Sequence, residues 1–202
     1  MRPPAWQEAL AVIQRSAPDV VAVWRAMDDG PMGFRRELRR RTGPGTAARI
    51  LAQQEAIADA LADALAACSD DLLRAPGGEE TWNVAQAFAH TTAARRWLAR
   101  AGALAAAGRW PSDAAETPVV RPGIPGPADA SRELLGSYLE KSRRSMVESA
   151  ALIAGHESDP CPLDHPLIGR LRCGEWLLWA GVHDLMHLEQ LHRLLDDPSH
   201  AA

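Results

Sequence analysis

Two histidines four residues apart lie within an otherwise apolar segment, "GEWLLWAGVHDLMHLEQLHRLL" (174–195). On an α-helix, positions four apart lie one above the other, so His183 and His187 share a face. Buried imidazoles need partners for both ring nitrogens, and two adjacent ones cannot both take up a proton at low cost. One divalent metal ion would satisfy the pair, but the spacing equally suits two core histidines bonded to neighbouring polar groups. A third ligand decides between them.

His90 is the candidate third ligand, in the segment "NVAQAFAHTTAARRWL" (83–98). On a helix it shares a face with Ala87 and Ala94, whose small side chains leave room beside the imidazole. Ligands donated by facing helices are typical of metal sites in helical bundles. Three neutral imidazoles with open coordination positions are the ligand set of a catalytic metal site, whereas a structural site is usually closed by thiolates.

The composition excludes several classes of protein. The chain has 202 residues, of which 47% are hydrophobic, so it can form a sizeable core and is not a disordered protein. A net charge of −4 argues against nucleic acids or anionic membranes as partners. The segment "FRRELRRRTG" (34–43) has five arginines within seven positions, and we expect a solvated helix face there rather than a phosphate-binding patch.

The cysteines and the hydropathy pattern indicate the compartment in which the protein is expected. Cys68, Cys161 and Cys173 form no C-x-x-C pair, which argues against a zinc ribbon or a disulfide scaffold and favours a reducing cytoplasm. The first ten residues carry no apolar stretch of signal-peptide length, and no run of about 18 apolar residues occurs. We therefore expect a soluble cytoplasmic protein that does not bind membranes.

The residue pattern predicts an all-α fold, because alanine and leucine dominate and no long stretch alternates with period two. We expect a four-helix bundle over 45–197, with an N-terminal helical extension, 1–44, packed against it. The bundle helices are expected at 45–68, 83–107, 128–154 and 174–196, and those of the extension at 4–27 and 32–41.

Two connections are expected between these helices. Residues 109–127 hold five prolines, which exclude a helix or a central strand. So long a connection usually crosses a fold or covers a site. We expect residues 156–174 to be irregular.

The sequence resembles the DinB/YfiT-like superfamily over about 45–196, most clearly in "ETWNVAQAFAH" (80–90) and "HPLIGRLRCGEWLLWAGVHDLMHLEQL" (165–191). That family's pattern is a Trp leading a helix with one His, a loop of the H-P-x-x-G type, a Trp, and H-x-x-x-H-x-x-Q near the C-terminus. The positions of this chain that match the pattern are Trp82, His90, His165, Pro166, Gly169, Trp176, His183, His187 and Gln190.

The resemblance implies a four-helix bundle that binds zinc or nickel through His90, His183 and His187. Family members of known activity are mostly thiol-dependent, such as mycothiol-dependent maleylpyruvate isomerase and bacillithiol S-transferases, and many form homodimers. It therefore suggests a transferase or isomerase that uses a low-molecular-weight thiol on a small-molecule substrate. Two alternatives stay open: a hydrolase that uses metal-bound water, and a bundle that binds a metal without catalysis.

Five further residues are candidates for supporting roles. Gln190 can orient a ligand imidazole or a bound water, and Asp184 is a candidate for an indirect catalytic role. Arg95 can contact an anionic thiol or acid substrate, Trp179 can wall the pocket, and His165 can lie at its mouth. Four of them also have a structural alternative: a backbone cap for Gln190, core packing for Trp179, and a position facing water for Arg95 and His165.

Overall fold

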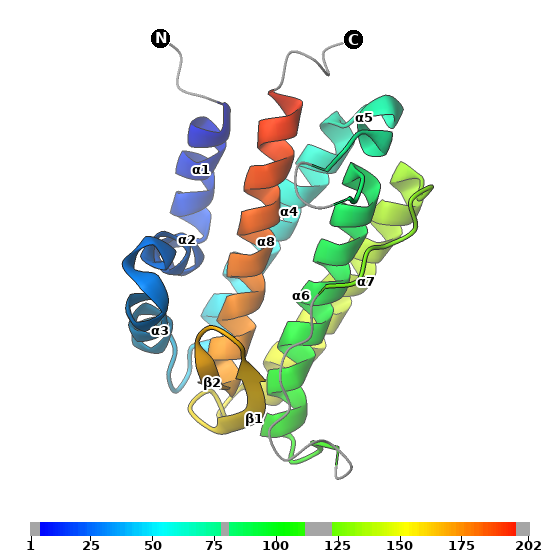
Figure 1. Ribbon diagram of the computed structural model, residues 1–202. Coiled ribbons are helices and arrows are strands. Elements are labelled where there is room, and N and C mark those ends of the chain that lie inside the picture. Colours follow the sequence, from blue (N-terminus) through cyan, green and yellow to red (C-terminus); the bar gives the residue numbers. More distant parts are fainter. Residues whose placement is uncertain (1–4, 78–80, 112–122, 197–202) are drawn as a thin grey trace.

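A computed structural model describes residues 5–77, 81–111 and 123–196 (Figure 1). It is an all-α four-helix bundle, as the sequence predicts. In cyclic order the bundle helices are α4, α7, α6 and α8, since α6 and α4 each pack against both α7 and α8. Their bounds are α4 Ala47–Ala67, α6 Val84–Ala106, α7 Arg132–Ile153 and α8 Cys173–Leu195.

The neighbouring helices α6 and α7 run in the same direction, while α4 and α8 run in the other (Figure 1). The connection between α6 and α7 must therefore return along the length of the bundle. Residues 112–122 of the expected crossing segment lie outside the described residues. The part that follows lies along α6, where the amide of Gly126 donates to the carbonyl of Gln86 at 3.4 Å and the Asn83 side chain donates to the carbonyl of Ala128 at 2.8 Å.

The N-terminus of α6 is fixed by a capping box. Asn83 accepts a hydrogen bond from the Gln86 amide at 2.9 Å, and the Gln86 side chain accepts one from the Asn83 amide at 3.1 Å. The two bonds satisfy amides that the first helical turn leaves without partners. They anchor the helix about two turns before His90.

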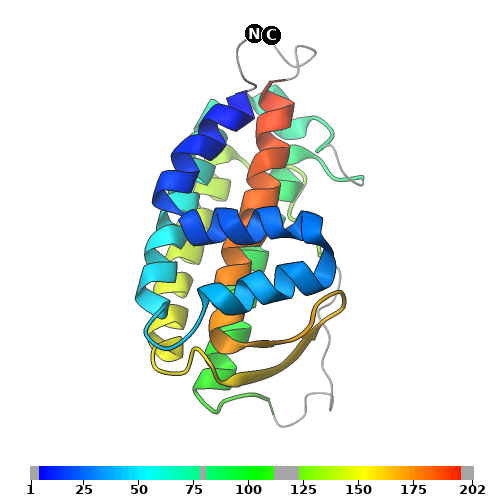
Figure 2. The same cartoon turned by 90° about the vertical axis from the view of Figure 1, so that its left-hand side faces the viewer.

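The N-terminal region consists of α1 (Ala5–Ser16), α2 (Pro18–Arg25), the 3₁₀ helix η1 (Ala26–Asp29) and α3 (Gly30–Arg41). The prediction of one helix over 4–27 is wrong, because Pro18 has no amide hydrogen to donate and starts a new helix. All three α-helices contact α8, and α1 and α2 also contact α4 (Figure 2).

A buried carboxylate ties this region to the bundle. Asp19 of α2 accepts hydrogen bonds from Arg41 of α3 at 2.7 Å and from Gln53 of α4 at 2.6 Å, and it also pairs with Arg49. Burial alone would raise the pKa of Asp19, but these hydrogen bonds and the arginine charges outweigh it and lower the pKa. The carboxylate is therefore charged at neutral pH and holds three helices together.

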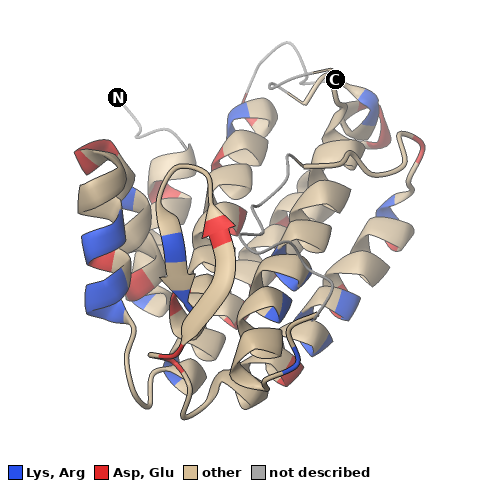
Figure 3. Cartoon of the chain, turned by 60° about the horizontal axis from the view of Figure 1, so that its bottom comes forward, with Lys and Arg blue, Asp and Glu red and all other residues tan. Residues whose placement is uncertain are grey.

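The expectation of a solvated face for the arginine-rich segment holds only in part. Arg41 is bonded to Asp19, and Arg39 pairs at 3.0 Å with Glu175, a fully buried side chain of α8. Arg35 donates to the carbonyl of Arg170 at 3.0 Å. These arginines thus attach α3 to the rest of the fold, next to the only hairpin in the described part of the chain (Figure 3).

Two elements were not expected from the sequence. Residues 156–174 contain an antiparallel hairpin, β1 (Pro160–His165) and β2 (Gly169–Arg172), so the prediction of an irregular connection is wrong. Its prolines conceal an alternation in which Cys161, Leu163 and Leu171 are buried. The second element, α5 (Asp70–Arg74), follows Ser69, whose hydroxyl accepts from the Leu72 amide at 3.1 Å.

No helix among the described residues is both long enough and apolar enough to cross a membrane.

Candidate metal centre

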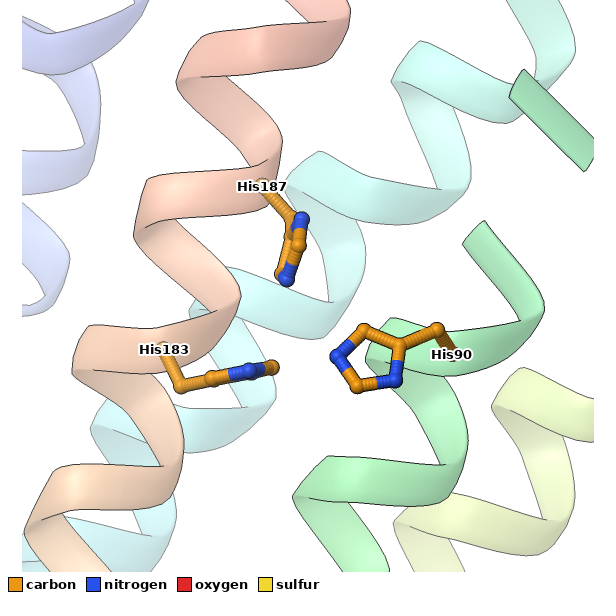
Figure 4. Close-up of side chains that lie close together, drawn as sticks. All are labelled: His90, His183 and His187. Atoms are coloured by element: carbon orange, nitrogen blue, oxygen red, sulfur yellow. The ribbon is translucent and has the colours of Figure 1, made fainter. Parts of the chain in front are cut away.

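Three imidazoles from two helices converge between α6 and α8 (Figure 4). His90 comes from α6, and His183 and His187 come from successive turns of α8. Ring centroids are 5.4 Å apart for His90 and His183, 5.3 Å for His90 and His187, and 4.7 Å for His183 and His187. One nitrogen of each ring lies within 4.8 Å of the others, and all three side chains are partly exposed.

The arrangement fits a divalent ion. Two ligand nitrogens of a tetrahedral zinc are about 3.4 Å apart, so small ring rotations bring three atoms within 4.8 Å onto one ion. Nδ1 of His183 is buried without a hydrogen-bond partner among the described residues, a state that is costly for a core histidine. Three nitrogen ligands also leave a coordination position for water or substrate.

Gln190 orients one of the imidazoles. Its side-chain oxygen lies 3.0 Å from Nδ1 of His187, and its amide nitrogen donates to the carbonyl of Gly77. Because an amide oxygen only accepts, Nδ1 of His187 carries the proton and Nε2 carries the lone pair that a metal needs. Gln190 thus makes both of the contacts that the sequence left open, one with an imidazole and one with a backbone group, and nothing in the sequence singled out Gly77.

The segment after residue 122 holds the ring of His90. A hydrogen bond joins the imidazole to the backbone of Ile124, and the ring of Trp82 lies 5.2 Å away. A Cβ atom built on Gly123 would lie 2.3 Å from Cε1 of His90 and 2.8 Å from its Nδ1. The expectation that this connection covers a site therefore applies to its described residues, although nothing in the sequence singles out Gly123.

Replacing Gly123 by alanine is expected to weaken metal binding about 10–100-fold, as loss of a group that orients a ligand does. The new methyl group would displace either the His90 ring or the segment that holds it. Competition with a chromophoric chelator measures the affinity. Gly136→Ala, on α7 with nothing within 4 Å, is the neutral control. Parental affinity in the Gly123 variant would show that the segment does not fix the ring.

The electrostatics of the cluster favour neutral rings. Burial lowers the pKa of His183 well below its usual value, and the neighbouring charges of His187, His90 and His165 lower it further. Burial, followed by the effect of His187, likewise lowers the pKa of His90, although the bond to Ile124 opposes this. Neutral imidazole is the form that binds a metal.

Two of the other candidates lie beside the cluster. Trp179 is almost fully buried, with its ring 6.5 Å from His183, 5.2 Å from His165 and 5.2 Å from Phe34. His165 ends β1 beside Trp176 and Trp179, and its Nδ1 accepts from the Leu167 amide at 3.3 Å. Trp179 thus packs against the cluster on the side of His183, and His165 contacts Trp179 rather than the cluster.

Of the last two candidates, Arg95 is placed differently from the sequence-based expectation, and Asp184 lies where an indirect role stays open. Arg95 and Asp184 are fully buried and bonded to each other at 2.7 Å. Because the Arg95 guanidinium is buried in this bond, it is not available to a ligand bound at the histidine cluster. The Asp184 carboxylate faces Arg95, about 100° around α8 from His183. Burial raises the pKa of Asp184, while the Arg95 charge opposes the shift.

A groove of about 450 Å³ lies next to the cluster, between α8 and the α2–η1 region. Its wall combines Trp24, Met27, Met186 and Leu194 with two arginines and two carboxylates. Gln190 lines the groove as well as contacting His187, and none of the three histidines lines it.

The fold and the cluster define a helical bundle with a group of three histidines placed so that they could hold a divalent metal ion. The chain belongs to the DinB superfamily, whose family model matches residues 51–191. That range includes α6, α8 and all three histidines. The chain has no significant match among curated proteins or among solved structures.

Proposed function

We propose that the chain is a metal-dependent transferase or isomerase that uses a low-molecular-weight thiol of the mycothiol or bacillithiol type. The observation that carries the proposal is the convergence of His90, His183 and His187 in a partly exposed cluster of a DinB-superfamily bundle. A zinc or nickel ion bound there would deprotonate a coordinated thiol, or lower the pKa of a coordinated water toward about 7.

The protein's own residues have defined parts in this proposal. Gln190 holds His187 in the tautomer that offers Nε2, and the Ile124 backbone holds His90. Trp179 limits access of water on the side of His183. The groove beside Gln190 is the proposed place for the part of a small-molecule substrate that does not react.

The chain's cysteines argue for an external thiol. Cys68, Cys161 and Cys173 are buried, and burial raises the pKa of Cys161 to about 11 and that of Cys173 to about 12. Such thiols form almost no thiolate at neutral pH. Cys173 is the first residue of α8, but ten residues separate it from His183, about 15 Å along the helix.

A thiol titration tests the proposal. Protein purified without an affinity tag is loaded with Co²⁺ or Ni²⁺ and titrated with mycothiol, bacillithiol or glutathione while the absorption spectrum is recorded. We expect a sulfur-to-metal charge-transfer band with mycothiol or bacillithiol and none with glutathione. An unchanged spectrum with every thiol, together with thiol-independent ester hydrolysis, would replace the proposal by the hydrolase alternative.

The same preparation separates the remaining alternatives. Metal content below about 0.1 per chain, with no uptake on addition, would rule out every metal-dependent function. A spectrum insensitive to all thiols, no hydrolysis and a sharp fall in melting temperature on metal removal would indicate a non-catalytic metal site. The proposal extends to a cytoplasmic location and to a homodimer, which light scattering tests.

A further inference from the structure

A buried ion pair joins the two helices that carry the histidines. The guanidinium of Arg95 on α6 donates from Nη1 to the carboxylate of Asp184 on α8 at 2.7 Å, and both side chains are 0% exposed. The Nη2 of Arg95 donates to the backbone carbonyl of Gln54 on α4 at 2.9 Å. The Gln54 side chain in turn donates to the carbonyl of Leu177 on α8 at 2.8 Å. One guanidinium thus links three bundle helices.

Stability alone does not account for this pair. Removing two charges from water is expensive, and buried ion pairs can often be replaced by apolar residues without loss of stability. The polar atoms here are also incompletely satisfied, since Nε of Arg95, Oδ1 of Asp184 and Oε1 of Gln54 have no partner among the described residues. The pair fixes the relative position of α6 and α8, and the loss of hydration of its charges opposes folding.

The apolar packing of α6 against α8 is less directional than the ion pair that joins the two helices. The buried face of α6 is rich in small side chains, including Ala87, Ala99 and Gly102. Apolar contact is non-directional, whereas the guanidinium fork fixes both the distance and the direction of its partner. A slip of one residue moves a helix by about 1.5 Å, three times the roughly 0.5 Å tolerance of a functional site.

We propose that the Arg95–Asp184 ion pair is a positioning device that sets α6 against α8 so that His90 meets His183 and His187 at coordination distance. Asp184 directly follows His183, and Arg95 is five residues beyond His90, so the link lies within about one and a half turns of ligands on both helices. The inference rests on the metal centre proposed above.

Two variants separate positioning from stability. In the double variant Arg95→Met, Asp184→Leu, apolar side chains fill the space, so we expect an unfolding midpoint no lower than that of the unchanged protein. We expect its affinity for Co²⁺ to fall about 10–100-fold and its visible spectrum to change. In Asp184→Asn, the amide oxygen still accepts from Arg95 but leaves a buried charge unpaired. This variant should be less stable and keep the parental spectrum.

A control comes from a partly exposed ion pair between two other bundle helices. Arg143 of α7 and Glu55 of α4 are bonded at 2.7 Å, and neither helix carries a ligand. The double variant Arg143→Met, Glu55→Leu should keep the parental Co²⁺ affinity and spectrum.

The outcomes are distinct. Parental Co²⁺ binding by the Arg95, Asp184 double variant, or an affinity that simply follows stability across all variants, would overturn the positioning role. If that double variant does not fold, Asp184→Asn decides, because a folded Asn variant with an altered spectrum contradicts the proposal. Absence of Co²⁺ binding by the unchanged protein would instead contradict the metal centre itself.

Discussion

Replacing His187 by alanine is expected to abolish metal binding. The change removes one of the two imidazoles that α8 supplies to the cluster and leaves His90 and His183, one ring from each helix. The loss of affinity should exceed the roughly 10–100-fold caused by removing a hydrogen-bond partner of a ligand. Elemental analysis and competition with a chelator measure the effect, and we expect less than about 0.1 metal per chain in the variant.

Two further variants provide metal affinities with which that of the His187 variant can be compared. His192→Ala, on the same helix but with its ring 5.5 Å from Trp6, should bind metal normally. Gln190→Leu removes the hydrogen bond to Nδ1 of His187 and should give an intermediate loss. Unchanged metal content in the His187 variant would mean that another residue completes the site.

His183 is expected to make a contribution to the stability of the metal-free protein that is lost as the pH falls below about 7. Burial, followed by the charges of the neighbouring histidines, lowers the pKa of His183 well below 6.5 in the folded state. The His183 imidazole therefore binds a proton near pH 6.5 in the unfolded chain but stays neutral at that pH in the folded chain. Since the unfolded state then holds more protons, the free energy of unfolding decreases on acidification, by about 1.4 kcal/mol per pH unit for one proton.

Urea unfolding in the presence of a chelator measures this slope, and His183→Gln isolates it. Glutamine does not titrate, so the variant should show a shallower decline with acidity than the unchanged protein. Asp184 acts in the opposite sense, because its pKa is raised, but it is common to both proteins and cancels in the comparison. His156→Gln, at a half-exposed position paired with Asp159, is the control. Equal slopes for the His183 variant and the unchanged protein would contradict the expectation.

The helices of the bundle and the helix faces that carry the histidines were predictable because they depend on local periodicity. The i, i+4 spacing of His183 and His187 fixes their relative position on any helix, and the box of Asn83 and Gln86 marks where α6 begins. Both signals act over one turn. They place a ligand on a helix face without knowledge of the tertiary structure.

The features that were missed depend on contacts between distant segments. Arginine side chains usually lie at the surface, so the sequence gives no reason to expect Arg95 in the interior. Only the tertiary structure brings Asp184, 89 positions away, within hydrogen-bond distance of it. The same holds for Gly123, whose lack of a side chain matters only because the His90 ring lies against it. The hairpin formed by β1 and β2 was hidden by its prolines.

The parallel course of α6 and α7 has a consequence for how this architecture diversifies. Two parallel neighbours require a long return strap, and here the strap passes the imidazole on α6. The described part of the strap, residues 123–131, is mostly exposed, so we expect insertions and exchanges there to leave the scaffold intact while they remodel the approach to the histidines. In this way the same arrangement of histidines can come to serve chemically different substrates in different members of an evolving family.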